Sequence, residues 1–264
     1  IRKLKAKYGN TVEDILSYRD ETELKLKQLT GEGTTAEQVD EELQALTEVL
    51  KQKGSELTQK RLSTAEKLSP LINEELHDLG MPHGRFCAQI TSPLLNKNGN
   101  PDVSSANSYG FDQIDFLISP NPGEDLKPLK KIASGGEISR VMLALKHQLA
   151  KVDKTPVLVF DEIDANIGGR MGEVIGEKLS SIARSHQVIC ITHLPQIASY
   201  ADEQWKVSKE VKNGKTYSTI ESLSGEARLE EIADMIRGSE KTAITRKQAQ
   251  EMLRDAKKKV KSKS

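Results

Sequence analysis

The residues best placed to do chemistry begin with Ser134-Gly135-Gly136-Glu137. Apolar residues recur at helical spacing behind them, so Ser134 is expected to cap a helix and Glu137 to complete a capping box. The two glycines leave the first backbone amides of that helix accessible, and the positive end of the helix dipole favours an anion such as phosphate. An ordinary capped helix after a Gly-Gly turn is the alternative interpretation.

Two adjacent carboxylates follow the apolar run 157–160. This run predicts a strand of a parallel sheet that is buried on both faces, and such sheets bind ligands at the carboxyl ends of their strands. Asp161 is therefore a candidate ligand of Mg²⁺, and Glu162 is a candidate to orient or deprotonate a water molecule. A strand that runs into a solvated acidic turn is the alternative.

A second apolar run, 188–191, ends in Thr192-His193. A histidine at the carboxyl end of a strand can sense or polarise a phosphate. A histidine that stands alone in this position is more often just a polar strand terminus, so the interpretation of His193 depends on the two motifs before it.

Three strings carry a resemblance to a known family, and they lie at 133–140 (Ala-Ser-Gly-Gly-Glu-Ile-Ser-Arg), 160–165 (Phe-Asp-Glu-Ile-Asp-Ala) and 191–198 (Ile-Thr-His-Leu-Pro-Gln-Ile-Ala). They are similar to the signature motif, the Walker B motif and the switch histidine of ATP-binding-cassette (ABC) ATPases. In their fuller form they resemble the bacterial RecN family of SMC-like DNA-repair ATPases. The resemblance covers most of the chain.

The resemblance implies an α/β fold, namely the C-terminal half of an ABC-type ATPase head with a mostly parallel sheet, flanking helices and a β-hairpin. It also implies an ATPase of DNA double-strand-break repair and recombination in which two heads form a homodimer around ATP and Mg²⁺, with DNA as a partner. In that family, residues 134–137 would contact the ATP of the partner head and Asp161 would hold Mg²⁺. Glu162 would activate water, and His193 would brace the γ-phosphate.

One element of such a head is not found in the sequence. A Walker A loop requires Gly-x-x-x-x-Gly-Lys-Ser/Thr, but Lys209 stands where the first glycine should precede Gly214-Lys-Thr216. Asn213-Gly214 instead predicts a hairpin turn. Because the chain starts with Ile1, the expectation is a fragment whose missing N-terminal half carries Walker A, and which is inactive by itself.

The chain is expected to divide into a helical coiled-coil arm, 1–80, and a C-terminal lobe of the head, 81–264. Capping boxes are predicted at Thr11 with Asp14 and at Thr34 with Glu37. An apolar seam near 4-3 spacing follows, formed by Val39, Leu43, Leu46, Leu50 and Leu57. In the lobe, strands are predicted at 85–90 and 110–118, a helix at 171–183, a hairpin at 205–220 and a helix at 227–236.

The composition of the chain restricts the partners it could bind and the cellular compartment it could occupy. The formal net charge is +0, so DNA contact would require a local patch. The five lysines from Lys257 onward are one candidate patch, and a solvated helix end is the default interpretation of them. The two cysteines lie far apart, which fits a reducing compartment. No apolar run has transmembrane length and no signal peptide is present, so the expectation is a cytoplasmic, nucleoid-associated protein without a membrane partner.

Two other interpretations remain open. Another SMC or Rad50-like ATPase head would share the signature and Walker B residues but differ at 191–198. An inert arm and dimerisation fragment would describe the chain if it acts alone. Asp164 and Asn166 are both candidates for a contact that crosses the dimer interface from the segment after Walker B.

Overall fold

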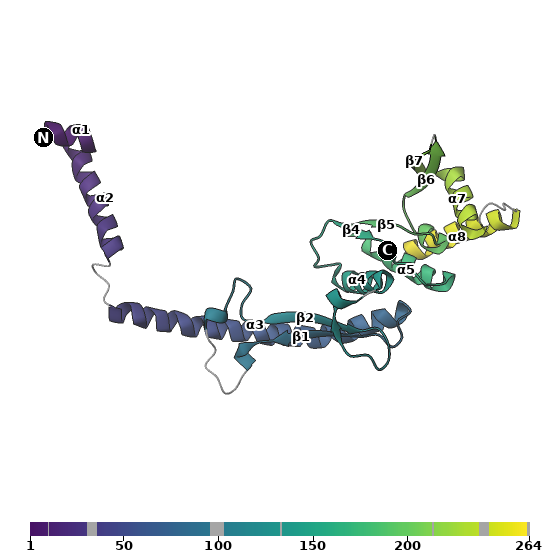
Figure 1. Ribbon diagram of the computed structural model, residues 1–264, viewed down its shortest axis with the longest axis horizontal. Coiled ribbons are helices and arrows are strands. Elements are labelled where there is room, and N and C mark those ends of the chain that lie inside the picture. Colours follow the sequence, from purple (N-terminus) through teal and green to yellow (C-terminus); the bar gives the residue numbers. More distant parts are fainter. Residues whose placement is uncertain are drawn as a thin grey trace. The chain divides into compact units, whose positions relative to one another are not determined.

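The structure is a computed structural model that describes residues 1–9, 11–30, 36–95, 103–132, 134–212, 214–237 and 243–262. It contains two compact units, the first made of residues 1–60 and 91–113 and the second of residues 61–90 and 114–264. Figure 1 shows the elements of both units along the chain. The sequence predicted one boundary, after residue 80. The two compact units are instead each made of separate stretches of the chain, and the helix Ala36–Asp78 (α3) contributes to both.

The first unit begins with helices α1 (Arg2–Tyr8) and α2 (Val12–Thr30), which precede α3. The capping box predicted before α2 is confirmed. The N–H of Thr11 donates to Oδ2 of Asp14 at 2.9 Å, and the N–H of Asp14 donates to the hydroxyl of Thr11 at 3.0 Å. The second predicted capping box depends on Thr34, which lies outside the described residues.

The predicted apolar seam lies on the surface of α3 in the first unit. Leu43 and Leu46 each leave 62% of their surface exposed, and Val39, Leu50 and Leu57 are exposed too. Leucines that recur at this spacing on a helix face are typical of a coiled-coil contact. In the part of the chain that the structure describes, the seam thus presents exposed apolar side chains that a partner helix could cover.

Tighter packing in the first unit surrounds Gly54. A Cβ atom on Gly54 would lie 2.6 Å from the ring of Phe111, which is buried. One turn later, the buried hydroxyl of Thr58 donates to Oδ1 of Asp112 at 2.6 Å. These contacts fix α3 against the segment that holds the short 3₁₀ turns η1 (Pro93–Leu95) and η2 (Val103–Ser105).

The second unit contains a three-stranded sheet in the order β1 (Arg85–Thr91), β2 (Gln113–Ser119), β3 (Lys127–Pro128). The strands predicted at 85–90 and 110–118 are confirmed as β1 and β2. The short antiparallel partner β3, which pairs Pro128 with Leu117, was not predicted. The side chain of Asn73 in α3 accepts a hydrogen bond from the N–H of Phe86 at 2.6 Å, so the helix is attached directly to β1.

The elements that carry the predicted motifs follow η3 (Leu129–Lys131), and they are helix α4 (Gly135–Leu149), strand β4 (Val157–Phe160), helix α5 (Gly169–Ile182) and strand β5 (Gln187–Cys190). β4 and β5 are parallel, with Val157 opposite Gln187 and Phe160 opposite Cys190. The core of this unit gathers side chains from α3, α4, α5 and the strands: Ile72, Leu76, Leu79, Phe86, Ile118, Val141, Leu143, Leu145, Leu158, Phe160, Ile163, Ile175, Leu179 and Ile182.

The prediction that these strands are buried on both faces is wrong for the described chain. Leu158 and Phe160 face the core, but Val159 is 64% exposed and Ile189 is 46% exposed. The described residues supply a hydrophobic core for one face of the pair alone. Parallel strands with one bare apolar face are uncommon, because such sheets are normally covered on both sides.

The chain ends with helix α6 (Pro195–Ala198), the hairpin β6 (Gln204–Lys212) and β7 (Lys215–Leu223), and helices α7 (Gly225–Arg237) and α8 (Ala243–Ser262). The predicted hairpin and the predicted helix at 227–236 are confirmed. Ala198, Ile232, Ala233 and Ala249 form a small second core between these helices. None of the helices in the described part of the chain combines the length and apolar character that crossing a lipid bilayer requires.

A buried carboxylate joins three helices of the second unit. Glu75 in α3 is 7% exposed, and its Oε1 lies 2.9 Å from Nδ1 of His147 and accepts from Gln148 at 2.8 Å in α4. Its Oε2 accepts from Lys178 in α5 at 2.6 Å. Burial by itself would raise the pKa of Glu75, but hydrogen bonds from His147 and Lys178 lower it to about 2. The charged form of Glu75 therefore stabilises the packing of α3 on α4 and α5.

We expect Glu75→Ala to lower the free energy of unfolding by roughly 3–5 kcal/mol, because it leaves Lys178 without its buried partner. Urea unfolding at neutral pH measures this. The pKa of Glu75 is lower in the folded chain than its unfolded value of ~4.3, so this stability is present above that pH and is lost as the pH falls toward 2.

The matched control is Glu74→Ala, one position earlier on the exposed side of the same helix. We expect it to change the free energy of unfolding by no more than about 0.5 kcal/mol. Equal effects of the two substitutions, or a Glu75→Ala effect that does not shrink between about pH 4 and pH 2, would contradict the role given to this carboxylate.

Candidate functional site

The start of α4 has the geometry that the sequence predicts for an anion site. Ser134 is the N-cap in an extended conformation, and its hydroxyl accepts a hydrogen bond from the N–H of Glu137 at 3.4 Å. Gly135 is exposed and Gly136 is buried. The first-turn amides of a helix have no acceptor within the helix, so this end can accept a phosphate oxygen from outside.

The acidic turn after β4 lies directly against this helix start. A Cβ atom on Gly135 would lie 2.1 Å from Oε2 of Glu162, so the carboxylate occupies space that a larger residue would need. A Cβ atom on Gly136 would lie 2.9 Å from Cβ of Ala165 and 3.1 Å from the carbonyl oxygen of Glu162. The two glycines thus allow α4 to approach the turn closely, which places the anion site beside a carboxylate.

Both carboxylates of the turn are exposed, as a site for solvent-borne ligands requires. Oδ1 of Asp161 accepts a hydrogen bond from the N–H of Glu162 at 2.8 Å. Glu162 has a φ of 56° and Asn166 a φ of 60°, both in the left-handed region that residues other than glycine rarely adopt. Strained backbone of this kind is frequent at functional sites.

Two residues of α4 that sequence reasoning left without a role hold the helix to the turn. The hydroxyl of Ser139 donates to the carbonyl oxygen of Asp161 at 2.7 Å, and Nη1 of Arg140 donates to the carbonyl oxygen of Ala165 at 3.2 Å. Arg140 is 8% exposed, and burial lowers its pKa from the usual arginine value. Arg140 follows Gly136 by four positions and so shares its helix face, which is the sequence signal that could have identified it.

The loop after β5 is organised by Asp164, which is 5% exposed. Its Oδ2 accepts from the hydroxyl of Thr192 at 2.5 Å and from the backbone N–H of His193 at 2.8 Å. The same oxygen lies 3.0 Å from Nδ1 of His193. The His193 side chain is nevertheless 72% exposed, so its other ring nitrogen is accessible.

The structure therefore brings the predicted residues together in two groups. Ser134, Gly135 and Gly136 lie with the acidic turn, whereas His193 joins that turn through Asp164. Of the two candidates for a contact across a dimer interface, Asp164 is buried and bonded within the chain, and Asn166 is exposed. In the described residues, no three His, Cys, Asp or Glu side chains gather as a metal cluster would.

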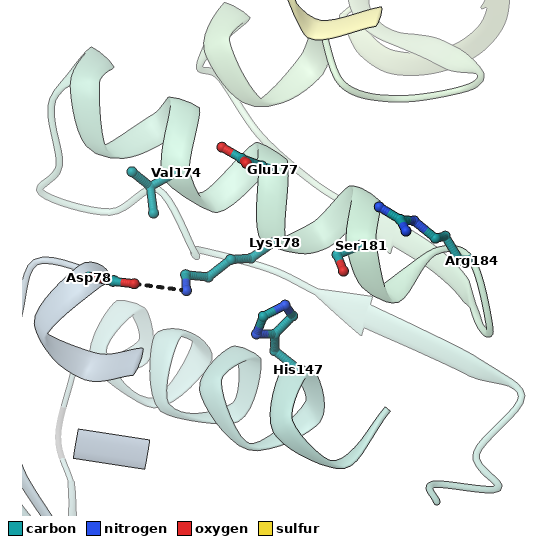
Figure 2. Close-up of a pocket in the computed structure, with 7 residues that line it drawn as sticks. All are labelled: Asp78, His147, Val174, Glu177, Lys178, Ser181 and Arg184. Atoms are coloured by element: carbon teal, nitrogen blue, oxygen red, sulfur yellow. Dashed lines mark hydrogen bonds and ion pairs between the residues drawn. The ribbon is translucent and has the colours of Figure 1, made fainter. Parts of the chain in front are cut away.

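A separate cavity of about 520 Å³ lies near the other end of α4. Figure 2 shows Lys178 of α5 reaching toward Asp78, with His147 and Arg184 also lining the cavity. The amino group of Lys178 donates to Oδ2 of Asp78 at 3.2 Å as well as to Glu75. His147 and Lys178 are engaged with the carboxylates of α3, so we do not include this cavity in the candidate site.

Comparisons with known proteins show what the chain is similar to. No family model matches the chain. DNA repair protein RecN of Bacillus subtilis is 36% identical over 97% of the chain and 45% of its own length, and RecN of Treponema pallidum is 39% identical over 96% of the chain and 44% of its own length. RecN of Deinococcus radiodurans is 38% identical over 90% of the chain and 40% of its own length.

A solved structure supports the fold. The Smc head domain with a coiled coil and joint from Pyrococcus yayanosii has a TM-score of 0.50 and 20% identity, over 86% of this chain and 39% of that one. The predicted fold class, an ATPase-head fragment with a helical arm, is confirmed. The chain spans less than half the length of the RecN proteins cited above and corresponds to their C-terminal part. It belongs to the RecN family.

Proposed function

We propose that the chain is the C-terminal half of an SMC-like ATPase head that acts in the repair of DNA double-strand breaks. The observation that carries the proposal is the contact between the anion site at the start of α4 and the acidic turn, where Gly135 meets Glu162. The relatives are named as DNA repair proteins, which gives the biological setting. We place the protein in the cytoplasm on the nucleoid, where its DNA partner lies.

The residues present suit ATP and Mg²⁺. Mg²⁺ is usually held by one or two carboxylates together with phosphate oxygens, and the exposed carboxylate of Asp161 fits that mode without a larger cluster. When bound, Mg²⁺ would offset phosphate charge. Glu162 would orient and deprotonate the attacking water, and His193 would brace the γ-phosphate. Phosphoryl transfer depends mainly on positioning and electrostatic stabilisation, which such groups supply.

The signature residues 134–137 would act on the nucleotide of a second head. Their amides and the Ser134 hydroxyl would bind the γ-phosphate of ATP held by the partner, so a homodimer would bury two nucleotides. Asn166, exposed in the segment that follows the acidic turn, is our candidate for the contact across that interface. We do not propose Asp164 for this contact, because its carboxylate is buried within its own chain.

The other half of the head would be the N-terminal part of the relatives, with the Walker A loop. Its docking is supported by the bare apolar face of β4 and β5, at Val159 and Ile189. It is also supported by one face of the hairpin, where Val207 and Ile220 are paired and are 63% and 65% exposed. Isolated two-stranded hairpins are marginally stable, so this face needs cover. By itself the chain would not hydrolyse ATP.

We expect Glu162→Gln, in a protein of the relatives' full length, to lower kcat by about 10²- to 10⁴-fold, because the amide cannot accept a proton from water. ATP should still bind, so a nucleotide-dependent dimer should accumulate in light scattering after gel filtration. Glu251→Gln on the exposed face of α8 is the control and should hydrolyse ATP normally. Unchanged hydrolysis by Glu162→Gln would remove this residue from the chemistry.

The two signature glycines should respond differently to alanine. Gly135→Ala meets the flexible end of the Glu162 side chain, so we expect normal folding with at least about tenfold slower hydrolysis. Gly136→Ala meets Cβ of Ala165 and a backbone carbonyl, which cannot move aside, so we expect roughly 1–3 kcal/mol of destabilisation. Urea unfolding and ATPase rates measure both effects. If Gly135→Ala destabilised the fold more than Gly136→Ala, the packing described at this contact would be wrong.

We expect Val159→Lys to weaken binding of the chain to a separately expressed N-terminal segment of the relatives by at least about tenfold, because it would bury a lysine at the interface. Co-expression and co-purification, followed by calorimetric titration, measure the loss. Val152→Lys, at a position 72% exposed after α4, is the matched control and should bind normally. If both variants bound equally well, the N-terminal segment would not dock on the exposed face of β4 and β5.

A further inference from the structure

Helix α8 carries a strong excess of positive charge. Seven of its 20 residues are lysine or arginine, and two are acidic. The formal net charge of the whole chain is +0, so the chain outside α8 is net negative. Positive charge confined to one element is the pattern expected of a local contact with a polyanion.

One side of α8 is apolar and is already covered. Ala249 and Ala256 are buried, and Met252 and Leu253 pack against the small core that the helix shares with α6 and α7 (Figure 1). An amphipathic helix binds a membrane by burying its apolar side in the lipid. Because that side of α8 is occupied within the chain, the helix is not suited to a lipid surface.

Most cations of α8 fall into two groups. Those beside the packed side form ion pairs with neighbouring helices, since Arg246 contacts Glu226 in α7 and Lys259 donates to Glu173 in α5 at 2.6 Å. The other group lies on the opposite side, at positions seven, four and three residues apart, which is the spacing of one helix face. We call this group the outer row, and its members are all exposed: Lys247, Arg254, Lys258 and Lys261.

The outer row has few competing contacts. In the described part of the chain, none of its three lysines forms an ion pair. Nε of Arg254 lies 3.7 Å from Oδ1 of its exposed neighbour Asp255, and Glu251 is exposed beside the row and offsets part of its charge. Lysines near the end of a helix favour its dipole, but that effect is limited to the last turn and does not account for Lys247.

The length and composition of the outer row favour nucleic acid over an acidic protein. Lys247 and Lys261 are about 21 Å apart along the helix axis, a length over which one DNA strand carries about six phosphates. Residues 247–261 are all described, and none of them is a large apolar residue with an exposed side chain. Protein interfaces, in contrast, are centred on aromatic and apolar anchors.

We propose that the outer row of α8 binds the phosphate backbone of duplex DNA without reading its base sequence. The identity of the polyanion rests on the proposed function in the repair of double-strand breaks, whereas the positive row itself does not. Lysine amino groups are flexible point charges, and contacts from such groups to phosphates position a protein on DNA without distinguishing bases.

DNA affinity is measured in a protein of the relatives' full length, without nucleotide, by fluorescence anisotropy of a labelled duplex over a range of salt concentrations. The four substitutions Lys247→Gln, Arg254→Gln, Lys258→Gln and Lys261→Gln together should reduce the slope of log Kobs against log salt by about three to four in magnitude, because each phosphate contact contributes about 0.9. Glutamine has a similar helix propensity, and circular dichroism checks the fold. Lys258→Gln with Lys261→Gln alone should give about half of the change. An unchanged slope would overturn the inference.

The matched control replaces one arginine and three lysines that are exposed but already paired with carboxylates: Arg19→Gln, Lys25→Gln, Lys27→Gln and Lys53→Gln. These substitutions change the net charge by the same amount, so the slope should stay within about one of the wild-type value. An equal reduction in both proteins would mean that DNA responds to net charge, and the outer row would lose its assigned role.

Anionic vesicles test the other class of polyanionic partner. Vesicles of phosphatidylserine and phosphatidylcholine should bind the wild-type protein more weakly than DNA does, because the apolar side of α8 is not free to enter lipid. If such vesicles bind as tightly as DNA and the outer-row substitutions abolish that binding, the site serves a membrane and the inference is wrong.

ATP hydrolysis separates this inference from the proposed function, because the outer row is distinct from the groups assigned to ATP. The four outer-row substitutions should leave hydrolysis without DNA unchanged. If they reduce the salt slope in a protein that hydrolyses no ATP, the proposed ATPase fails and the DNA contact stands. If hydrolysis is normal and the slope is unchanged, the DNA contact fails and the ATPase stands.

Discussion

The close approach of α4 to the turn after β4 is the contact on which the site depends. It requires glycine at 136, since any side chain there would meet Cβ of Ala165 and the carbonyl of Glu162. The hydrogen bonds of Ser139 and Arg140 then hold the helix in place. A helix start that is a candidate anion site and a pair of carboxylates are thereby fixed beside each other, although Ser139 and Asp161 lie 22 positions apart in the sequence.

The features that could be predicted from the sequence are those that neighbouring residues determine. The cap at Ser134 and the capping box of Thr11 with Asp14 each join residues three positions apart. The strands β4 and β5 were recognisable as short apolar runs, and their parallel pairing brings the ends of both runs to one edge. Because ligand groups follow those ends, the candidate site could be located from the sequence, although the contacts inside it could not.

The remaining features depend on contacts between distant parts of the chain. Glu75 meets Lys178, 103 positions later, and nothing in the pattern of α3 indicates that this one carboxylate is buried. Asp164 meets His193, 29 positions later, whereas sequence reasoning offered its carboxylate as one of two candidates for a contact across an interface. The exposure of Val159 was also not predicted. Whether a strand face is buried depends on the elements that pack on it, and the sequence of the strand does not reveal them.

One turn of five residues links the three chemical elements of the site. Asp161 and Glu162 present their carboxylates outward, the backbone of the same turn binds α4, and the buried carboxylate of Asp164 binds the His193 loop. Packed protein interiors transmit displacement because they contain few voids. If α4 binds a phosphate as proposed, a shift of this helix would reach the acidic turn through the hydrogen bonds of Ser139 and Arg140, and the His193 loop through Asp164. In the proposed dimer of heads, contact with the partner's nucleotide would thus affect the groups that we propose act on the head's own nucleotide.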